Sequence, residues 1–532
     1  MKARADVIYL NGSIWTGVAG AIRAEALAVQ DEEIMAVGSI TEINSLQGPQ
    51  TKVVDLQGGF VVPGLIDNHT HFISGGQQLA SVDLRDASSR EEFIRRLGEF
   101  AGKLPDGRWI TGGDWDHEAW GGELPQRDWI DAVTREVPVF VSRLDGHMAL
   151  ANSKALELAG ITPETLDPEG GMIVRDRATG RPTGILKDEA MGLVYAVIPE
   201  VTEQERDEAL VRAMNHAVLH GVTQIYDMGS WRDLETYRRA AQTNSLKLRV
   251  YSFVPISTWS QLKQYREEHG RGDAWHRWGG LKGFVDGSLG STTAWFYKPY
   301  DDAPGTSGLM VTDTSKLRAW ISAGDAAGFQ IAVHAIGDRA NDWILNTYAS
   351  IAAANGPRDR RFRIEHAQHL TVAAIARFHR QGVIPAMQPY HAIDDGRWAE
   401  KRIGPDRIKT TYAFRSLLDA GAPLCFGSDW TVAPLSPLEG IYAAVTRRTI
   451  DGLNPEGWVP EQKITVEQAL RCYTINAAYA GFFETQTGTL EPGKLADFVV
   501  LSEDLFAIDP VDIPQVQVLM TVVGSKVQYR AE

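Results

Sequence analysis

Histidine and aspartate side chains follow several short apolar segments of this sequence. His69 and His71 follow the first such segment, and His334, His366 and Asp429 follow three later ones. Imidazole nitrogens and carboxylate oxygens are the ligands that Zn²⁺ and similar divalent ions take in proteins. Two histidines one residue apart on an extended chain project to the same side, so both can reach one ion. The pattern therefore predicts a metal centre.

A lysine accompanies this set. Lys282 lies in another apolar segment, 281–285, and we expect its amine to point to the same region. A single histidine after a strand is more often a hydrogen-bonded structural residue than a ligand. The joint pattern carries more weight, because burying four histidines and an aspartate without an ion would leave costly polar groups unpaired.

The segments that carry these residues have the length of strands and alternate with helix-like segments. The predicted strands are 60–66, 222–226, 248–254, 281–285, 330–333, 362–364, 383–387 and 423–426. The predicted helices are 203–220, 314–327, 339–354, 371–381 and 405–420. This alternation is typical of an α/β protein with a (β/α)₈ TIM barrel, whose active sites form at the carboxyl ends of the strands.

The two ends of the chain have a different character, rich in short strands and turns. Residues 1–59 and 480–532 each form too small a sheet to stand alone, so we expect them to pair into one small β-sandwich. Residues 60–479 then form the barrel domain. Within it, residues 72–215 break the alternating pattern after the first barrel strand, and we interpret them as an insertion over the barrel mouth.

Composition excludes some functions. The chain has 532 residues, 44% of them hydrophobic and 23% charged, as in folded globular proteins. Its net charge of −15 argues against nucleic acid as a partner, because binding phosphates needs a basic face. No apolar run is long enough for a membrane span. Two cysteines build no disulfide framework, and we expect a cytoplasmic protein that binds a small molecule, with a homodimer left open.

Several motifs together resemble the amidohydrolase superfamily, in particular its amidohydrolase 3 branch, which includes N-substituted formamide deformylases. The resemblance covers nearly the whole chain. The motifs that carry it are His69-Thr70-His71 within 62–71, Lys282-Gly283 within 281–290, His334-Ala335-Ile336-Gly337-Asp338, Glu365-His366-Ala367-Gln368, Gly427-Ser428-Asp429, and the segment 493–500.

The resemblance implies a binuclear metal centre. His69 and His71 would hold one ion with Asp429, and the two later histidines would hold the second. Lys282 would bridge them as N6-carboxylysine, which requires its amine to be neutral first. Two Zn²⁺ per chain are expected, with manganese, iron or nickel as alternatives. The competing interpretation keeps Lys282 as an ammonium group beside a single ion.

The resemblance also assigns catalytic roles. A metal-bound hydroxide would attack the substrate carbonyl, and Asp429 would carry a proton from the water to the leaving amine. His147, in the insertion, would contact the substrate carbonyl or the developing oxyanion, although a structural role is as plausible from the sequence.

Six further residues are expected to bind substrate; for two of them, Asp286 and Arg339, which closely follow metal ligands, orienting those ligands and binding a substrate carboxylate are both open. The six are Asp286, Arg339, Gln388, His391, Trp115 and Trp430. The two tryptophans belong to a group of five, with Trp120, Trp295 and Trp398, on segments expected near the barrel mouth. Together the five indicate a bulky or aromatic substrate group, although tryptophans as often serve packing alone.

The sequence thus predicts a hydrolase of carbon–nitrogen bonds in small non-peptide amides, of the N-acyl or N-formyl type. Two alternatives stay open: a hydrolytic deaminase of a ring substrate, and a non-catalytic binding or regulatory relative. Deaminases of this superfamily use one metal and leave the bridging position empty, so Lys282 counts against the first alternative. The complete set of ligand residues counts against the second.

Overall fold

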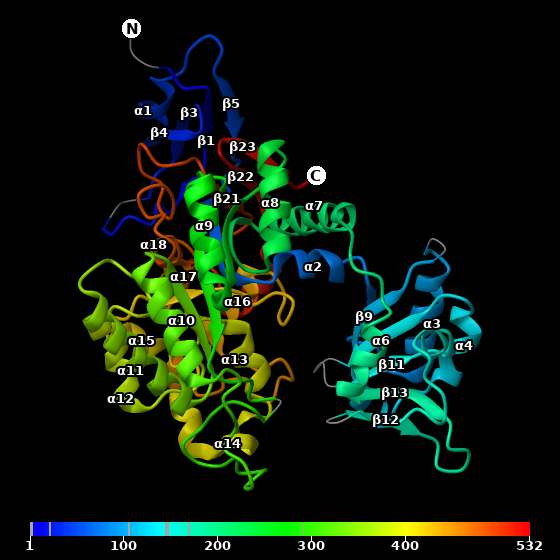
Figure 1. Cartoon of the computed structure of the whole chain (residues 1–532). Helices are drawn as coiled ribbons and strands as arrows, with labels where there is room; N and C mark the ends of the chain where they lie inside the picture. The colour runs from blue at the N-terminus through cyan, green and yellow to red at the C-terminus, as the bar shows by residue number, and fades with distance from the viewer. Residues whose placement is uncertain (1–3, 21–22, 105–106, 144–147, 169–170, 291) are drawn as a thin grey trace. The chain divides into compact units, whose positions relative to one another are not determined.

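The computed structural model of the chain describes residues 4–20, 23–104, 107–143, 148–168, 171–290 and 292–532. These residues form two compact units (Figure 1). One consists of Met1–Ile73 together with Leu210–Glu532, and the other of Ser74–Ala209. Within the described parts, no helix has both the length and the apolar character that crossing a membrane requires.

The larger unit contains an eight-stranded parallel sheet. Its strands, in hydrogen-bonded order, are β7 (Leu65–Thr70), β14 (Val222–Met228), β15 (Arg249–Pro255), β16 (His276–Phe284), β17 (Gln330–Ala335), β18 (Arg363–His366), β19 (Ile384–Met387) and β20 (Cys425–Phe426). A parallel bridge between Thr70 and Trp430 joins the first strand to the segment after the last. The predicted TIM barrel is confirmed.

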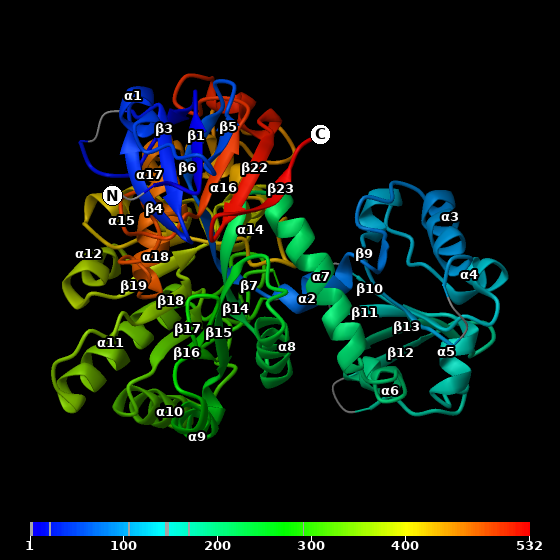
Figure 2. The same ribbon diagram turned by 90° about the horizontal axis from the view of Figure 1, so that it is seen from above.

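Burial explains why these segments form strands and helices. Every residue of β14 is buried, as expected for a parallel strand covered on both faces. The flanking helices bury one stripe each: α11 (Asp338–Asn355) buries Ile344, Leu345 and Tyr348 on the face toward the barrel. In Figure 2, α10 (Thr314–Ala326) and α11 lie along the outside of β16 and β17.

The predicted strand 60–66 is wrong as a single element, because Gly64 divides it. Before the glycine, β6 (Phe60–Pro63) pairs with β21 (Phe498–Leu501), and after it β7 enters the barrel. A Cβ atom on Gly64 would lie 2.2 Å from Oγ1 of Thr223. Only glycine allows the chain to pass that close to the neighbouring barrel strand.

The predicted helix 405–420 is also interrupted. The chain forms α14 (Ala399–Arg407), η4 (Ile408–Thr410) and α15 (Phe414–Asp419) in its place. Tyr412, between the last two, has a φ of 49°, which a helix does not allow. This break brings the Tyr412 side chain into the region after β19, where its hydroxyl donates to Asp395.

The two ends of the chain form a β-sandwich, as predicted. One sheet contains β1 (Val7–Leu10), β3 (Ala26–Gln30), β4 (Glu33–Gly38) and β5 (Lys52–Asp55). The other combines β2 (Ser13–Ile14) and β6 with β21, β22 (Val518–Val523) and β23 (Lys526–Arg530). Figure 1 shows the blue and red strands side by side. Apolar side chains from both sheets, such as Tyr9, Val29, Phe498 and Val522, fill the space between them.

The unit Ser74–Ala209 has its own six-stranded sheet and apolar core. The strands are β8 (Val82–Asp83), β9 (Ile110–Trp115), β10 (Val139–Arg143), β11 (Met148–Ala151), β12 (Gly171–Arg175) and β13 (Pro182–Asp188). Helices α3 (Arg90–Ala101) and α4 (Arg127–Thr134) contribute Phe93, Leu97 and Ile130 to that core.

Candidate metal centre

Three potential ligands converge at the carboxyl end of the barrel. His69 lies on β7, His366 ends β18, and Asp429 follows β20. One ligand atom of each lies within 4.8 Å of the other two, and all three residues are buried. Adjacent strands of a parallel barrel end on the same rim, which is why residues so distant in sequence meet here.

The other three predicted ligands surround this group. Nζ of Lys282 lies 3.3 Å from Nε2 of His69. Nε2 of His71 lies 3.3 Å from Oδ1 of Asp429. The ring of His334 lies 4.6 Å from the ring of His366, centroid to centroid. The structure therefore brings all six residues to one rim of the barrel.

Buried partners fix the orientation of two imidazoles. Nδ1 of His69 lies 2.5 Å from Oε2 of Glu365, and Nδ1 of His366 lies 2.7 Å from Oε1 of Gln388. An amide oxygen only accepts hydrogen bonds, so His366 carries its proton on Nδ1. Each ring consequently presents an unprotonated Nε2 as its ligand atom, the arrangement common in metal-bound histidines.

Glu365 is itself held by an arginine. Arg363, on the same strand, donates to both carboxylate oxygens of Glu365 at 2.7 and 3.0 Å, and both side chains are fully buried. Although burial raises the pKa of Glu365, the Arg363 guanidinium and the His69 ring lower it to about 2. Glu365 therefore stays anionic beside His69. No role was predicted for Glu365, although its position directly before the candidate ligand His366 is a signal in the sequence.

His334 and Asp286 are positioned by the backbone. Nε2 of His334 donates to the carbonyl of Gly287 at 2.9 Å, which leaves Nδ1 as its ligand atom. The Asp286 carboxylate accepts from the N–H groups of Trp295, Ile336 and Gly337. Asp286 thus fixes the loop after His334, in agreement with the orienting role among those expected for it.

The surroundings of Asp429 fit those of a metal ligand. Its Oδ1 is buried and accepts no hydrogen bond among the described residues, although His71 and His69 lie 3.3 and 3.5 Å away. Nε2 of His69, Nε2 of His71 and Oδ1 of Asp429 thus converge on a common point. A divalent cation at that point would satisfy them, since buried polar atoms are otherwise paired. The residues fit the predicted metal.

The backbone is strained at two of these positions. His366 has a φ of 74° and Asp429 a φ of 59°, in a region that residues with a side chain rarely adopt. Such conformations cost about 1–3 kcal/mol each and persist where function requires them. Here the strain turns both side chains into the rim.

Burial shifts the pKa of the histidines and of the lysine toward their neutral, ligand-competent forms. It lowers the pKa of His69 to about 4 and that of His334 to about 3, with the charge of Lys282 as the next cause. It lowers the pKa of Lys282 to about 8. Burial alone would raise the pKa of Asp429, but the His69 ring holds it well below its ordinary value.

A cavity of about 370 Å³ opens onto the metal centre. Its lining contains the potential ligands His71, Lys282, His334, His366 and Asp429. Apolar and aromatic side chains form another part of the wall: Phe284, Leu289, Ile336, Trp398 and Val432. Gly290 and the polar residues Ser288, Gln368, His391, Asp394 and Asp395 complete it. The volume suits a small molecule.

Three of the predicted substrate contacts differ in their position relative to the cavity. His391 lines the cavity, with its ring stacked 6.4 Å from that of His366. Gln388 is fully buried behind His366 and has the orienting role described above. Arg339 is exposed, with its guanidinium 4.3 Å above the Trp295 ring and outside the cavity lining.

The two predicted tryptophans are packed in apolar surroundings. Trp115 is fully buried in the core of the Ser74–Ala209 unit, where its indole N–H donates to the carbonyl of Val141. Trp430 is 4% exposed and stacks on His216. Neither offers a free ring to a substrate within its own unit, so the structure gives both a packing role. His147 lies outside the described residues.

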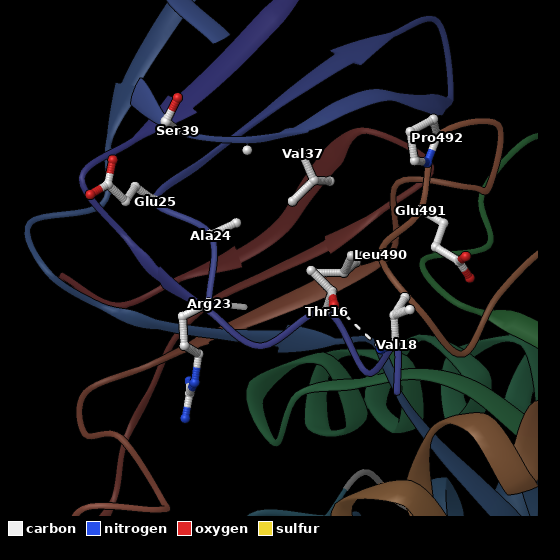
Figure 3. A pocket seen from close by; sticks show the side chains of 11 residues that line it. Thr16, Val18, Arg23, Ala24, Glu25, Val37, Ser39, Leu490, Glu491 and Pro492 are labelled. Atoms are coloured by element: carbon white, nitrogen blue, oxygen red, sulfur yellow. Dashed lines mark hydrogen bonds between the residues drawn. The ribbon is translucent and has the colours of Figure 1, made fainter. Parts of the chain in front are cut away.

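Another cavity, of about 540 Å³, lies in the β-sandwich (Figure 3). Its charged groups already have partners: Arg23 lies 3.2 Å from Asp504, and Glu491 lies 3.3 Å from Lys494. The hydroxyl of Thr16 accepts from the N–H of Val18, as the dashed line shows. The barrel cavity, with its converging ligand atoms, is therefore the candidate site.

Comparisons with known proteins agree with this geometry. Residues 52–529 match the model of the Amidohydrolase family. Protein LONG AFTER FAR-RED 3 of Arabidopsis thaliana is 44% identical over 99% of this chain and 92% of its own length. The N-substituted formamide deformylase of Arthrobacter pascens is 28% identical over 99% of both chains.

A solved structure extends the likeness to three dimensions. The uncharacterized metal-dependent hydrolase of Pyrococcus horikoshii OT3 matches with a TM-score of 0.80 and 29% identity, covering 95% of this chain and 99% of its own. Fold, ligand motifs and sequence thus lead to one assignment. The chain belongs to the Amidohydrolase family, in its amidohydrolase 3 branch.

Proposed function

We propose that this chain hydrolyses carbon–nitrogen bonds of small non-peptide amides, of the N-formyl or N-acyl type. The observation that carries the proposal is the convergence of His69, His366 and Asp429 beside Lys282, at the wall of a small-molecule cavity. The deformylase of Arthrobacter pascens, similar over nearly its whole length, supports the choice of amide. No arginine or serine–histidine pair is needed for this chemistry.

The residues at the rim would hold two divalent ions, which we propose to be zinc. His69, His71 and Asp429 would hold one ion, and His334 and His366 the other. When bound, such ions supply Lewis acidity, which makes a water molecule more acidic and polarises a carbonyl. Lys282 would bridge them as N6-carboxylysine; its lowered pKa favours the neutral amine that carboxylation needs.

Asp429 would handle the proton. Because its pKa is low, the carboxylate is ionised at neutral pH and can take a proton from the attacking water. It would then deliver that proton to the amide nitrogen as the carbon–nitrogen bond breaks. The products are a carboxylic acid, or formate, and an amine. Glu365 and Gln388 would take no part in the proton transfer. They would hold His69 and His366 in the orientation that metal binding requires.

The test combines metal analysis with a substrate screen. Purified protein, stripped of metal and then reloaded with zinc, is assayed for amine release from N-formyl and N-acyl amines. We expect activity only in the reloaded sample, about two metal equivalents per chain, and the added mass of one carboxyl group on Lys282. One equivalent, an unmodified lysine and ammonia release from a ring substrate would instead favour deamination.

We further propose that the protein works in the cytoplasm. Cys425 and Cys472 are both free thiols, and both are buried. Free thiols suit a reducing compartment, although they do not require one. Fusion of the full chain to a fluorescent protein, followed by imaging, tests this placement.

A further inference from the structure

The cavity beside the metal centre has an acidic wall on one helix. Helix α13 (Pro389–Asp395) follows β19 and contributes His391, Asp394 and Asp395 to the lining. Residues three and four apart share one face of a helix. His391 stacks near His366, and the two carboxylates lie one turn further along the same face. A substrate held at the metals would thus extend toward Asp394 and Asp395.

Asp395 is held in place with one oxygen engaged. Its Oδ2 accepts from the Tyr412 hydroxyl at 2.6 Å, and Tyr412 is fully buried. Tyr412 is fixed in turn by its backbone, since its N–H donates to the Gln368 carbonyl and its own carbonyl accepts from Arg447. Asp394 pairs with the exposed Arg397, which is not among the lining residues. Asp395 is therefore a pre-positioned acceptor.

Aromatic rings and the balance of charge complete the argument. Trp398 and Phe284 also line the cavity, and aromatic faces attract organic cations. Among the described lining residues there is no arginine, and Lys282 is the one lysine, beside His69. No side-chain cation in that lining remains for a substrate carboxylate, whereas Asp395, with the Arg397-paired Asp394 beside it, offers a carboxylate to a substrate cation.

We infer that the acidic wall of α13 recognises a protonated amine, or a similar organic cation, on the part of the substrate distant from the scissile bond. The ligand would place its charge between Asp395 and Asp394, with its apolar portion against Trp398. The inference rests on the proposed amide hydrolysis and narrows its substrate class. It predicts that N-acyl amino acids, whose free carboxylate would meet this wall, are poor substrates.

Three matched formamides test the inference in the zinc-loaded protein. They are N-benzylformamide and its analogues with a para aminomethyl or a para carboxylate group. We expect kcat/KM to be roughly ten- to hundred-fold higher for the cation than for the neutral compound, as charged hydrogen bonds allow. The anion should be poorest. Equal values for all three compounds would overturn the inference and leave amide hydrolysis standing.

Variants localise the effect. Asp395→Asn keeps an oxygen for the Tyr412 hydroxyl but loses the charge, and should reduce the ratio of cation to neutral kcat/KM by about ten-fold. Asp394→Asn should reduce it less, because Arg397 already neutralises that residue. The matched control is Asp406→Asn, which removes a 91%-exposed carboxylate paired with Lys409 outside the cavity. A ratio that Asp406→Asn changes as much as Asp395→Asn would refute the assignment.

A binding measurement separates this inference from the proposed reaction. Benzylammonium and benzyl alcohol have no scissile bond, so calorimetry reports their binding without hydrolysis, and the difference between the two reports the charge of the ligand. We expect the ammonium ion to bind at least ten-fold more tightly, and Asp395→Asn to abolish the difference. If benzylammonium binds preferentially while no formamide is cleaved, hydrolysis is wrong and the cation site stands. If the cation is preferred neither in binding nor in kcat/KM, the cation site is wrong.

Discussion

Buried charged groups have different partners at the two ends of the barrel. At the amino end, charges pair with each other: Arg249 donates to both oxygens of Asp497, at 2.6 and 2.9 Å, with both side chains almost fully buried. At the carboxyl end, His69, His366 and Asp429 converge without bonding to one another. The first arrangement is complete in itself, whereas the second is complete only with an added cation.

This difference distinguishes buried polar groups that stabilise the fold from buried polar groups that form a site. Asp497 precedes β21, so its pair with Arg249 at the start of β15 fastens the β-sandwich to the barrel. The carboxyl end is supported from behind, by Glu365 and Gln388, so that its ligand atoms stay free in front. Buried ionisable groups that orient outer partners but leave an inner atom unpaired are the mark of a site.

The largest effect is expected at the unpaired end. Asp429→Asn keeps the shape of the side chain but removes its ability to accept a proton at neutral pH. We expect kcat to fall by about 10²–10⁴-fold, the usual contribution of a proton-transfer group. Metal content, measured by mass spectrometry, should stay close to that of the parent. Near-normal turnover of the variant would remove Asp429 from the proposed mechanism.

At the paired end, the expected effect is on stability. Arg249→Met leaves the Asp497 carboxylate buried without its partner, which should lower the free energy of unfolding by about 3–5 kcal/mol. Thermal unfolding of metal-loaded protein measures the change. Arg415→Met is the control, because its pair with Asp419 is exposed and such pairs contribute little. If Arg249→Met lost metal but not stability, the contrast between the two ends would fail.

Local signals explain how much of the barrel could be predicted. Strand-length apolar runs alternating with helical stripes predicted all eight strand regions, and polar residues just after them predicted which side chains meet at the rim. What failed depends on contacts across the chain. The strand 60–66 divides because Gly64 approaches Thr223, about 160 residues away, which no local pattern reveals.

The roles of the supporting residues were hidden for the same reason. Glu365 bonds to His69, 296 positions earlier in the chain, so its neighbours in sequence give no indication of the partner. Gln388 looked like a substrate contact because it ends a strand, yet its amide oxygen turns to His366. Trp115 was expected to contact substrate because it lies in a turn-rich segment. An aromatic residue in such a segment can equally belong to the core of a separate sheet, as Trp115 does.

A supporting residue should contribute less than the proton-transfer group. The fold loss of metal affinity when it is substituted should be smaller than the fold loss of kcat in Asp429→Asn. Glu365→Gln keeps an acceptor for Nδ1 of His69 but removes the negative charge, and should lower metal affinity by about 10–100-fold. Competition with a metal chelator measures it without any assay of activity. Glu439→Gln, a half-buried glutamate of α16 (Pro437–Thr446), serves as the control. Unchanged metal affinity in Glu365→Gln would show that the buried carboxylate serves folding alone.

The smallest expected effect is a pH dependence of ligand binding. It distinguishes two parts of the carboxyl end: the metal side, formed by the predicted ligands, and the cation side, formed by Asp394 and Asp395. Burial, and next the hydrogen bond from Tyr412 and the charges of Asp394 and Arg397, set the pKa of Asp395 at about 7, above its ordinary value. A raised carboxyl pKa means that the anion forms only as the pH rises through 7. We therefore expect benzylammonium to bind about ten-fold more weakly at pH 6 than at pH 8. Benzyl alcohol, measured in parallel, corrects for titration of the metal side, because both ligands meet the same histidines. In Asp395→Asn the difference between the two ligands should no longer depend on pH; a dependence that survives this substitution would assign the titration to another group.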